Sequence, residues 1–169
     1  MTQDITQLIA QLIAPDPNGR AIALAALVRH GLAASPALQT CLQSPNVMLR
    51  AQAAHALAEI GDPASAGVLA LGLGDADPRV RGRCAQGLAH LGDARALDAL
   101  IQTLNDIPDE LHYPRSVATM ALCNYGQEAI AKVTPLLNSD DVLTRERARL
   151  VVRQCMNSAK TTGSPTHEP

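Results

Sequence analysis

Residues 44–73 read SPNVMLRAQAAHALAEIGDPASAGVLALGL, and residues 75–104 read DADPRVRGRCAQGLAHLGDARALDALIQTL. The second stretch follows the pattern of the first without a gap, and Arg81 stands 31 residues after Arg50. Self-similarity at a fixed period of about 20–50 residues indicates a repeat architecture. The same residues recur along the chain: the arginines are Arg20, Arg50, Arg81, Arg115 and Arg145, and the glycines are Gly31, Gly61, Gly92 and Gly126. The repeat therefore extends over nearly the whole chain.

Each repeat predicts two helices. A residue that caps helices well stands four positions before the arginine, where its side-chain oxygen accepts from a free backbone N–H; these residues are Asp16, Asn46, Asp77 and Asp141. Apolar residues then recur at helical spacing, as between Val47 and Leu57. The glycine ends this first helix because glycine readily adopts the left-handed conformation found after helices. Asp62 and Asp93 follow as caps of second helices.

The predicted fold is all-α, an α-solenoid (superhelix) of about four helix pairs with an extra helix at each end. The first extra helix is an amphipathic segment at about 4–13. We interpret the periodic arginines as structural, because a contact between repeats must recur in every unit whereas a binding residue need not. We expect a single domain at 1–156, with repeats at about 16–44, 45–75, 76–110 and 111–139, a terminal helix at 141–156 and a disordered tail at 157–169.

Composition excludes several classes of partner. The 169 residues include no Phe, no Trp and two Tyr, so single-stranded nucleic acid would find few rings to stack on. A net charge of −2 creates no general field for polyanions. No apolar run approaches the roughly 18 residues of a membrane span. The first residues carry no Lys or Arg before the apolar positions, unlike a signal peptide, so we expect a cytoplasmic protein without nucleic-acid or membrane partners.

The four cysteines, Cys41, Cys84, Cys123 and Cys155, lie 43, 39 and 32 residues apart. They form no CxxC motif and have no His at ligand spacing, unlike zinc sites or a compact disulfide framework. We expect lone buried thiols and no metal site.

The recurring pattern resembles a known repeat. A capping Asp, Val-Arg, an Ala-rich helix, Leu-x-x-Ile/Leu-Gly-Asp and a second Ala/Leu helix are clearest at 45–104. They resemble the bacterial HEAT-like repeat, often called the phycobilisome-lyase HEAT-like repeat, over about 16–156. The fourth repeat departs from the pattern at Cys123–Gln127, and the first departs from it at Leu32. The resemblance implies second helices that line a concave face, in a fold that serves many functions.

One face of the second helices changes character along the chain. In the third repeat Arg95, Asp98 and Gln102 form a polar stripe at i, i+3 and i+7. The equivalent positions are small or apolar in the first two repeats: Ala34, Ala37, Cys41, Ala64, Gly67 and Leu71. An exposed apolar groove marks a partner site; alternatively, the small residues only let neighbouring helices approach. The candidate contacts on this face are Ala37, Cys41, Gly67, Leu71, Arg95, Asp98, Gln102 and Lys132.

The third repeat also has a longer connection, residues 105–114, which carries three acids, one His and one Tyr. Insertions in repeat arrays decorate one face. Plain loop decoration is the first interpretation, recognition of a partner the second, and cation binding a distant third because no ligand spacing is present. The candidate contact residues of this loop are Asp106, Asp109, Glu110, His112 and Tyr113.

The last helix carries Arg145, Arg149 and Arg153 at i, i+4 and i+8. Residues at the equivalents of the last two are small or apolar in earlier repeats. A terminal repeat needs a polar outer face, so plain capping explains these arginines. The functional alternative is a small dock for an acidic partner or a phosphate.

Residues with catalytic chemistry are few. The only His-Glu pair, of the type found in the di-iron hydroxylase relatives of the repeat, is His167-Glu168 in the expected tail. No acid, base or nucleophile constellation is present. We predict no catalytic residue, metal or cofactor, and a non-catalytic adaptor that binds another protein as a monomer or weak homodimer. The alternatives are a bilin-lyase-type subunit that handles a tetrapyrrole, which rests on fold analogy, and a self-associating structural module.

Overall fold

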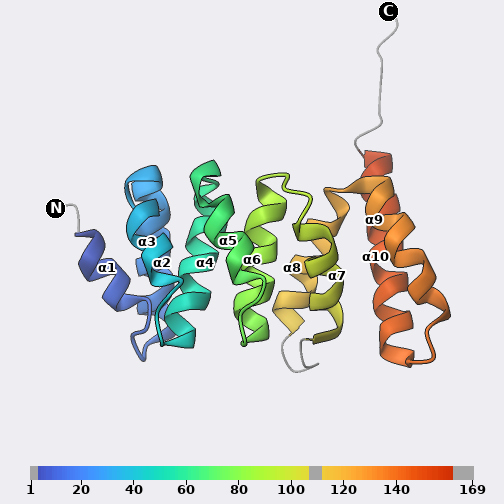
Figure 1. The fold of residues 1–169 in the computed structure, drawn as a ribbon, viewed down its shortest axis with the longest axis horizontal. Coiled ribbons are helices and arrows are strands. Elements are labelled where there is room, and N and C mark those ends of the chain that lie inside the picture. Colours follow the sequence, from blue (N-terminus) through green and yellow to red (C-terminus); the bar gives the residue numbers. More distant parts are fainter. Residues whose placement is uncertain (1–3, 107–111, 162–169) are drawn as a thin grey trace, which may run out of the picture. The chain divides into compact units, whose positions relative to one another are not determined.

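The computed structural model describes residues 4–106 and 112–161, with the backbone alone at 103, 105–106, 112–117 and 158–161. Every element in the described part is a helix (Figure 1). The α-helices are α1 (Ile5–Gln11), α2 (Pro17–His30), α3 (Ser35–Cys41), α4 (Val47–Ile60), α5 (Ala66–Gly72), α6 (Pro78–His90), α7 (Ala96–Asp106), α8 (His112–Cys123), α9 (Gly126–Val133) and α10 (Val142–Thr161), and the 3-10 helices are η1 (Gly31–Ala33), η2 (Pro63–Ser65) and η3 (Thr134–Asn138). This confirms the predicted all-α repeat solenoid.

The chain divides into two compact units, Met1–Ala99 and Leu100–Pro169. The boundary falls inside α7. Each repeat of a solenoid contacts mainly its neighbours, so an array can divide into compact units without containing separate domains. The single domain expected at 1–156 therefore stays a prediction.

The predicted starts of four first helices are confirmed by their capping hydrogen bonds. Asp16 accepts from the backbone N–H groups of Asn18 and Gly19, and Asp77 accepts from that of Arg79. Asn46 and Asp141 cap α4 and α10 in the same way. The first helices are followed by glycines with φ between 52° and 70°, a region that side chains disfavour: Gly31, Gly61, Gly92 and Gly126.

The periodic arginines hold the loop that precedes their own helix. Arg50 Nη1 donates to the carbonyl oxygens of Ser44 and Pro45, at 2.9 and 3.3 Å. Arg20 and Arg81 make the equivalent pair of bonds in the first unit, and Arg145 makes it in the second. Each guanidinium therefore pairs carbonyl groups that belong to no helix. The structural interpretation holds for these four arginines, and the Arg115 side chain lies outside the described residues.

In the first unit, each of the six helices α1 to α6 contributes a leucine that is fully or almost fully buried: Leu8, Leu27, Leu38, Leu57, Leu69 and Leu88. Consecutive first helices pack against one another, α2 on α4 and α4 on α6, and α5 packs on α6. A Cβ at Gly87 would lie 2.9 Å from Leu69 Cδ1 and 3.4 Å from Ala58 Cβ. A glycine at position 87 therefore permits the close approach of α6 to α4 and α5.

In the second unit, α8, α9 and η3 pack on α10 or on one another. Leu100, Leu122, Val133 and Val151 are buried there. The helix α10 ends at Thr161, five residues beyond the predicted end, so the expected tail is helical at its start. Residues 162–169 of that tail lie outside the described part.

The expectation of four lone thiols is wrong for two of them. Cys123 and Cys155 form a disulfide, with their Cα atoms 4.6 Å apart. Cys123 occupies the repeat position of Ala58, which in the first unit faces the next first helix. The packing of α8 on α10 therefore brings the two sulfurs together across one repeat length.

Among the described residues, no single helix is long and apolar enough to cross a membrane. The stretches Pro17–Ala33 and Ser35–Cys41 reach that length and composition only together, and the chain bends by 119° between them.

Reduction of the disulfide is expected to destabilise the protein. The disulfide closes a loop of 32 residues, which lowers the conformational entropy of the unfolded chain. This effect stabilises the folded state by about 3–4 kcal/mol. Urea unfolding of the full chain should show a lower midpoint with reductant or in Cys123→Ser, whereas Cys41→Ser without reductant should unfold as wild type. Four alkylated thiols in the mass spectrum of the unreduced, denatured protein would contradict the disulfide.

Candidate functional site

A pocket of about 180 Å³ opens between the second helices of the first two repeats. Its walls come from the end of α3 and from α5, and its base comes from the loop between α5 and α6. The lining residues are Gln39, Leu42, Gln43, Val68, Leu71, Gly72, Gly74, Asp75 and Val80. The pocket thus combines aliphatic side chains with two amides and one carboxylate.

Leu71 is the most exposed large hydrophobic residue of the described part, with 78% of its surface accessible. It stands in the last turn of α5 at the edge of the pocket. Leu69 of the same helix is fully buried, so α5 presents one leucine to the core and another to solvent. The exposed Leu71 side chain is therefore accessible for a contact outside the chain.

The other candidates on the second-helix face differ in exposure. Gly67 is exposed, and a Cβ there would have no atom within 4 Å, so this glycine does not serve helix packing. Ala37 and Cys41 are half-buried and do not line the pocket. Arg95, Asp98, Gln102 and Lys132 are all exposed, as the polar stripe predicts.

Close helix packing accounts for another small residue of the pocket. A Cβ at Gly72 would come within 2.3 Å of Cys84 Sγ on α6. Glycine is therefore required where α5 crosses α6. The two interpretations of the small residues thus separate by position: Gly72 serves packing, whereas Gly67 and Leu71 face solvent.

Sequence comparison missed the α3 side of the pocket. On this side the lining residues are not part of the i, i+3, i+7 stripe of the first repeat; they are Gln39, Leu42 and Gln43. Gln39 Nε2 also donates to the buried Ser65 Oγ of η2, at 3.1 Å, which fixes this side chain between neighbouring repeats. The signal available in the sequence was the position of Leu42 and Gln43 directly after α3, where the chain turns toward the next repeat.

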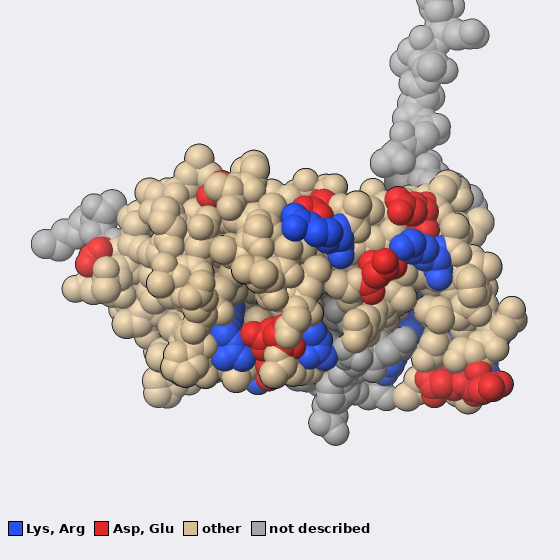
Figure 2. Space-filling view, viewed as in Figure 1, with Lys and Arg blue, Asp and Glu red and all other residues tan. Residues whose placement is uncertain are grey.

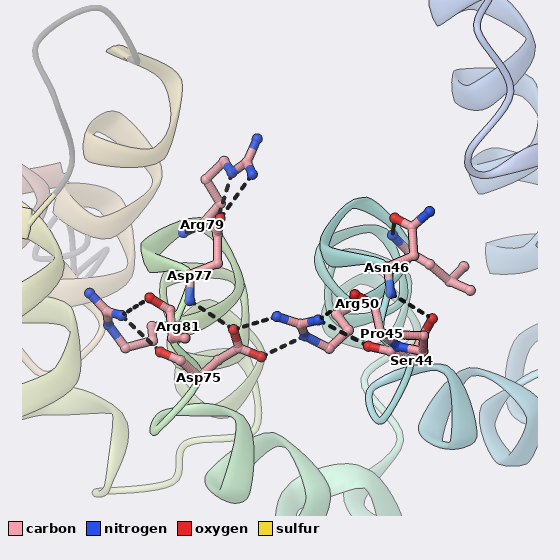
Figure 3. A network of polar contacts seen from close by, with 10 residues as sticks. Ser44, Pro45, Asn46, Arg50, Asp75, Asp77, Arg79 and Arg81 are labelled. Atoms are coloured by element: carbon pink, nitrogen blue, oxygen red, sulfur yellow. Dashed lines mark hydrogen bonds and ion pairs between the residues drawn. The ribbon is translucent and has the colours of Figure 1, made fainter.

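The surface over α3 and α5 carries few charges (Figure 2). The nearest charged pair to the pocket is Arg50 with Asp75, in which Nε and Nη2 donate to the two carboxylate oxygens at 2.7 and 2.9 Å. Figure 3 shows this fork, with the same guanidinium held by the carbonyl groups of Ser44 and Pro45. The pair thus ties the loop after α3 to the loop after α5 and sets the base of the pocket.

Electrostatics at this pair favour the charged forms. The side chains of Arg50 and Asp75 are only 15% and 11% exposed. The hydrogen bonds from Arg50 hold the pKa of Asp75 below its ordinary value of 3.8, and the Asp77 N–H contributes in the same direction. Asp75 is therefore a carboxylate at neutral pH and already has its partners.

The titratable groups near the first-unit helices are not poised for chemistry at neutral pH. Burial, with the Asp75 charge second, raises the pKa of Cys84 to about 12, and burial raises the pKa of Cys41. Burial, with the Arg83 charge second, lowers the pKa of His55 to about 4. Among the described residues, no three His, Cys, Asp or Glu side chains are grouped as metal ligands.

The remaining candidates fall in two places. Asp106, Asp109, Glu110, His112 and Tyr113, the loop candidates, have side chains outside the described residues. Arg149 and Arg153 line a second pocket, in the second unit, and Arg145 does not. Arg145 donates instead to the carbonyl oxygens of Ser139 and Asp140, and the anion dock at the three arginines stays a prediction.

Comparison with known proteins identifies the fold family. The profile for HEAT repeats matches residues 5–74 and 66–153. The chain belongs to the HEAT-repeat family.

Among solved structures, the complex of CpcE and CpcF of phycocyanin lyase from Nostoc sp. PCC7120 contains a similar chain, at 29% identity and a TM-score of 0.69. The match covers 87% of this chain and 96% of that one. An engineered protein with 19% identity and a TM-score of 0.53, covering 98% of this chain and 91% of its own, shares the fold. No curated protein sequence matches. These findings support the phycobilisome-lyase type of HEAT-like repeat predicted from the sequence.

Removing the Asp75 charge is expected to destabilise the protein in a pH-dependent way. Asp75→Asn should lower the free energy of unfolding at pH 7, because the Arg50 guanidinium loses its anion. The folded-state pKa lies below 3.8, so the wild-type contribution is full above that value and is lost as the pH falls through the folded pKa.

Denaturant unfolding of both proteins between pH 7 and pH 2 tests this expectation, and the difference between them should shrink only at the acid end. Glu146→Gln is the matched control, because Glu146 and its partner Arg149 are each 60% exposed and such a pair contributes little. A constant difference down to pH 2 would contradict the role of the carboxylate charge.

Proposed function

We propose that this chain is a non-catalytic adaptor whose partner is another protein that binds at the pocket between α3 and α5. The observation that carries the proposal is Leu71, 78% exposed at the edge of an apolar pocket on a surface with few charges. An interface of this kind gains its affinity from a few apolar anchors surrounded by polar contacts.

The chemistry of the pocket indicates what the partner presents. Leu42, Val68 and Leu71 favour an aliphatic or aromatic side chain, and the exposed Gln43 lies beside them as a polar group for the partner's backbone. Asp75 adds no free anion because Arg50 holds it. We therefore expect affinity that varies little with salt concentration.

The similarity to one chain of the CpcE–CpcF complex supports a protein partner, because that structure is an assembly of two different proteins. The same similarity favours a second candidate function, a subunit of the bilin-lyase type that handles a tetrapyrrole. The two functions differ in an observable: a tetrapyrrole changes the visible absorption spectrum of the protein, whereas a protein partner does not.

The cytoplasmic location is part of the proposal. The Cys123–Cys155 disulfide bears on it directly, since disulfides persist mainly in oxidising compartments. Alkylation of the protein in intact cells of its host, before lysis, measures the redox state there. Reduced cysteines agree with the cytoplasm, and an intact disulfide contradicts it.

Leu71→Asp is expected to abolish partner binding without unfolding the protein. Burying Leu71 contributes about 2 kcal/mol, and a carboxylate in its place must also be desolvated, so affinity should fall by about 30-fold or more. Affinity capture from the native host, followed by mass spectrometry and an absorption spectrum of the eluate, tests this.

Leu32→Asp is the matched control, because Leu32 is 66% exposed on η1 and does not line the pocket. A protein that both wild type and Leu32→Asp retain, and that Leu71→Asp loses, supports the adaptor. A coloured eluate without such a protein supports the tetrapyrrole function instead. Equal capture by all three proteins, with equal helical circular dichroism, overturns the assignment of the pocket.

A further inference from the structure

The outer face of α10 carries a second pocket, unrelated to the one between α3 and α5. It has a volume of about 320 Å³ and is formed by η3 and α10 of the second unit. Leu137, Val152 and Met156 supply its apolar surface, with Arg149 and Arg153 beside them. The pocket is therefore lined mostly by apolar surface, and two arginines are among its lining residues.

The residues on this face of α10 can be compared with those at the same repeat positions in α4. Arg149 and Arg153 occupy the positions that are Ala54 and Ala58 in α4. Both alanines are almost fully buried, and Ala58 lies against Gly87 of the next first helix. By repeat position, the face of α10 that carries Arg149 and Arg153 thus corresponds to the face of α4 that contacts the next first helix.

Plain solvation of a terminal repeat explains the two arginines but not the apolar pocket. Met156 is 51% exposed and Leu150 is 42% exposed on the same helix. A face that only met water would place polar side chains at these positions. Arginines beside exposed aliphatic groups instead match a partner with carboxylates beside apolar side chains.

The charges on this face are accessible. Arg149 Nη1 pairs with Glu146 Oε1 of the same helix, and both side chains are 60% exposed, so the pair contributes little and is easily exchanged. Arg153 is exposed and forms no ion pair with the described residues. The two arginines are four residues apart on one helix, which separates them by about 6 Å along its axis.

We propose that this face binds an acidic amphipathic helix of a partner protein. Two carboxylates one turn apart on that helix pair with Arg149 and Arg153, and an apolar side chain between them enters the pocket against Val152 and Met156. The guanidinium groups provide specificity because they form forked bonds with carboxylates. The partner helix takes the place that a further repeat would occupy in a longer array.

A designed peptide tests the proposal on the full chain. The probe is a fluorescein-labelled, 16-residue Ala-rich helix with two Glu four residues apart and Leu on the same face. Fluorescence anisotropy should show binding that weakens as salt is raised. A matched peptide with Gln at both Glu positions should bind about tenfold more weakly or worse.

Charge reversal separates a binding role from a structural one. The double variant Arg149→Glu with Arg153→Glu should lose binding by about tenfold or more and should regain it for a peptide with Lys at the two Glu positions. Arg29→Glu is the control, because Arg29 is exposed on α2 in the other unit. Circular dichroism and the unfolding midpoint check that all variants fold alike.

Three results overturn the proposal. The proposed pairing of carboxylates with Arg149 and Arg153 is wrong if the Glu and Gln peptides bind with equal affinity. It is also wrong if the Lys peptide does not restore binding to the double variant. Displacement of the peptide by millimolar inorganic phosphate makes the face a small-anion site. Concentration-dependent dimers of wild type that the double variant does not form make a second copy of this chain the occupant.

Discussion

The bond between each periodic guanidinium and the loop before its helix is the contact on which the repeat depends. A tight connection between two helices leaves backbone carbonyl groups without helical partners, and an unpaired buried carbonyl is costly. Arg20, Arg50, Arg81 and Arg145 supply donors to those groups from within the first turn of the helix that follows. The same pair of bonds therefore recurs in the loop before each of these four helices.

Asp75 extends this local bond into a link between repeats. Arg50 Nη1 donates to a carbonyl oxygen of the loop before its own helix. Its Nε and Nη2 donate to the carboxylate of Asp75 in the next such loop (Figure 3). The link lies at the base of the pocket between α3 and α5. Neither of these two helices contains a charged residue. The one carboxylate that lines the pocket is thus paired within the protein.

The first helices of the first unit and the terminal helix α10 differ in the residues on the face that follows the repeat pattern. In the first unit, alanine and glycine bring α4 and α6 close together, and burial of leucine from every helix stabilises the stack. In the second unit, α10 keeps an inner face that packs on α8 and changes the outer face to arginine beside Met156. The disulfide between Cys123 and Cys155 stabilises the side of α10 that faces α8, while the opposite side remains accessible.

The sequence by itself determined the fold and the residues that begin and end the first helix of each repeat. A 31-residue period, a capping Asp or Asn, an arginine four residues later and a glycine at the helix end are local requirements of hydrogen bonding and backbone conformation, so they appear directly in the order of residues. Comparing the repeats position by position also singled out Leu71 and Gly67 as candidates, but it left open whether this face is exposed or serves helix packing. Tertiary structure alone decided the rest. The Cys123–Cys155 bond and the α3 side of the pocket, with Gln39 and Leu42, depend on which side chains meet across neighbouring repeats. Such meetings are set by the packing distance and rotation of one helix against the next, which no residue spacing within a single helix specifies.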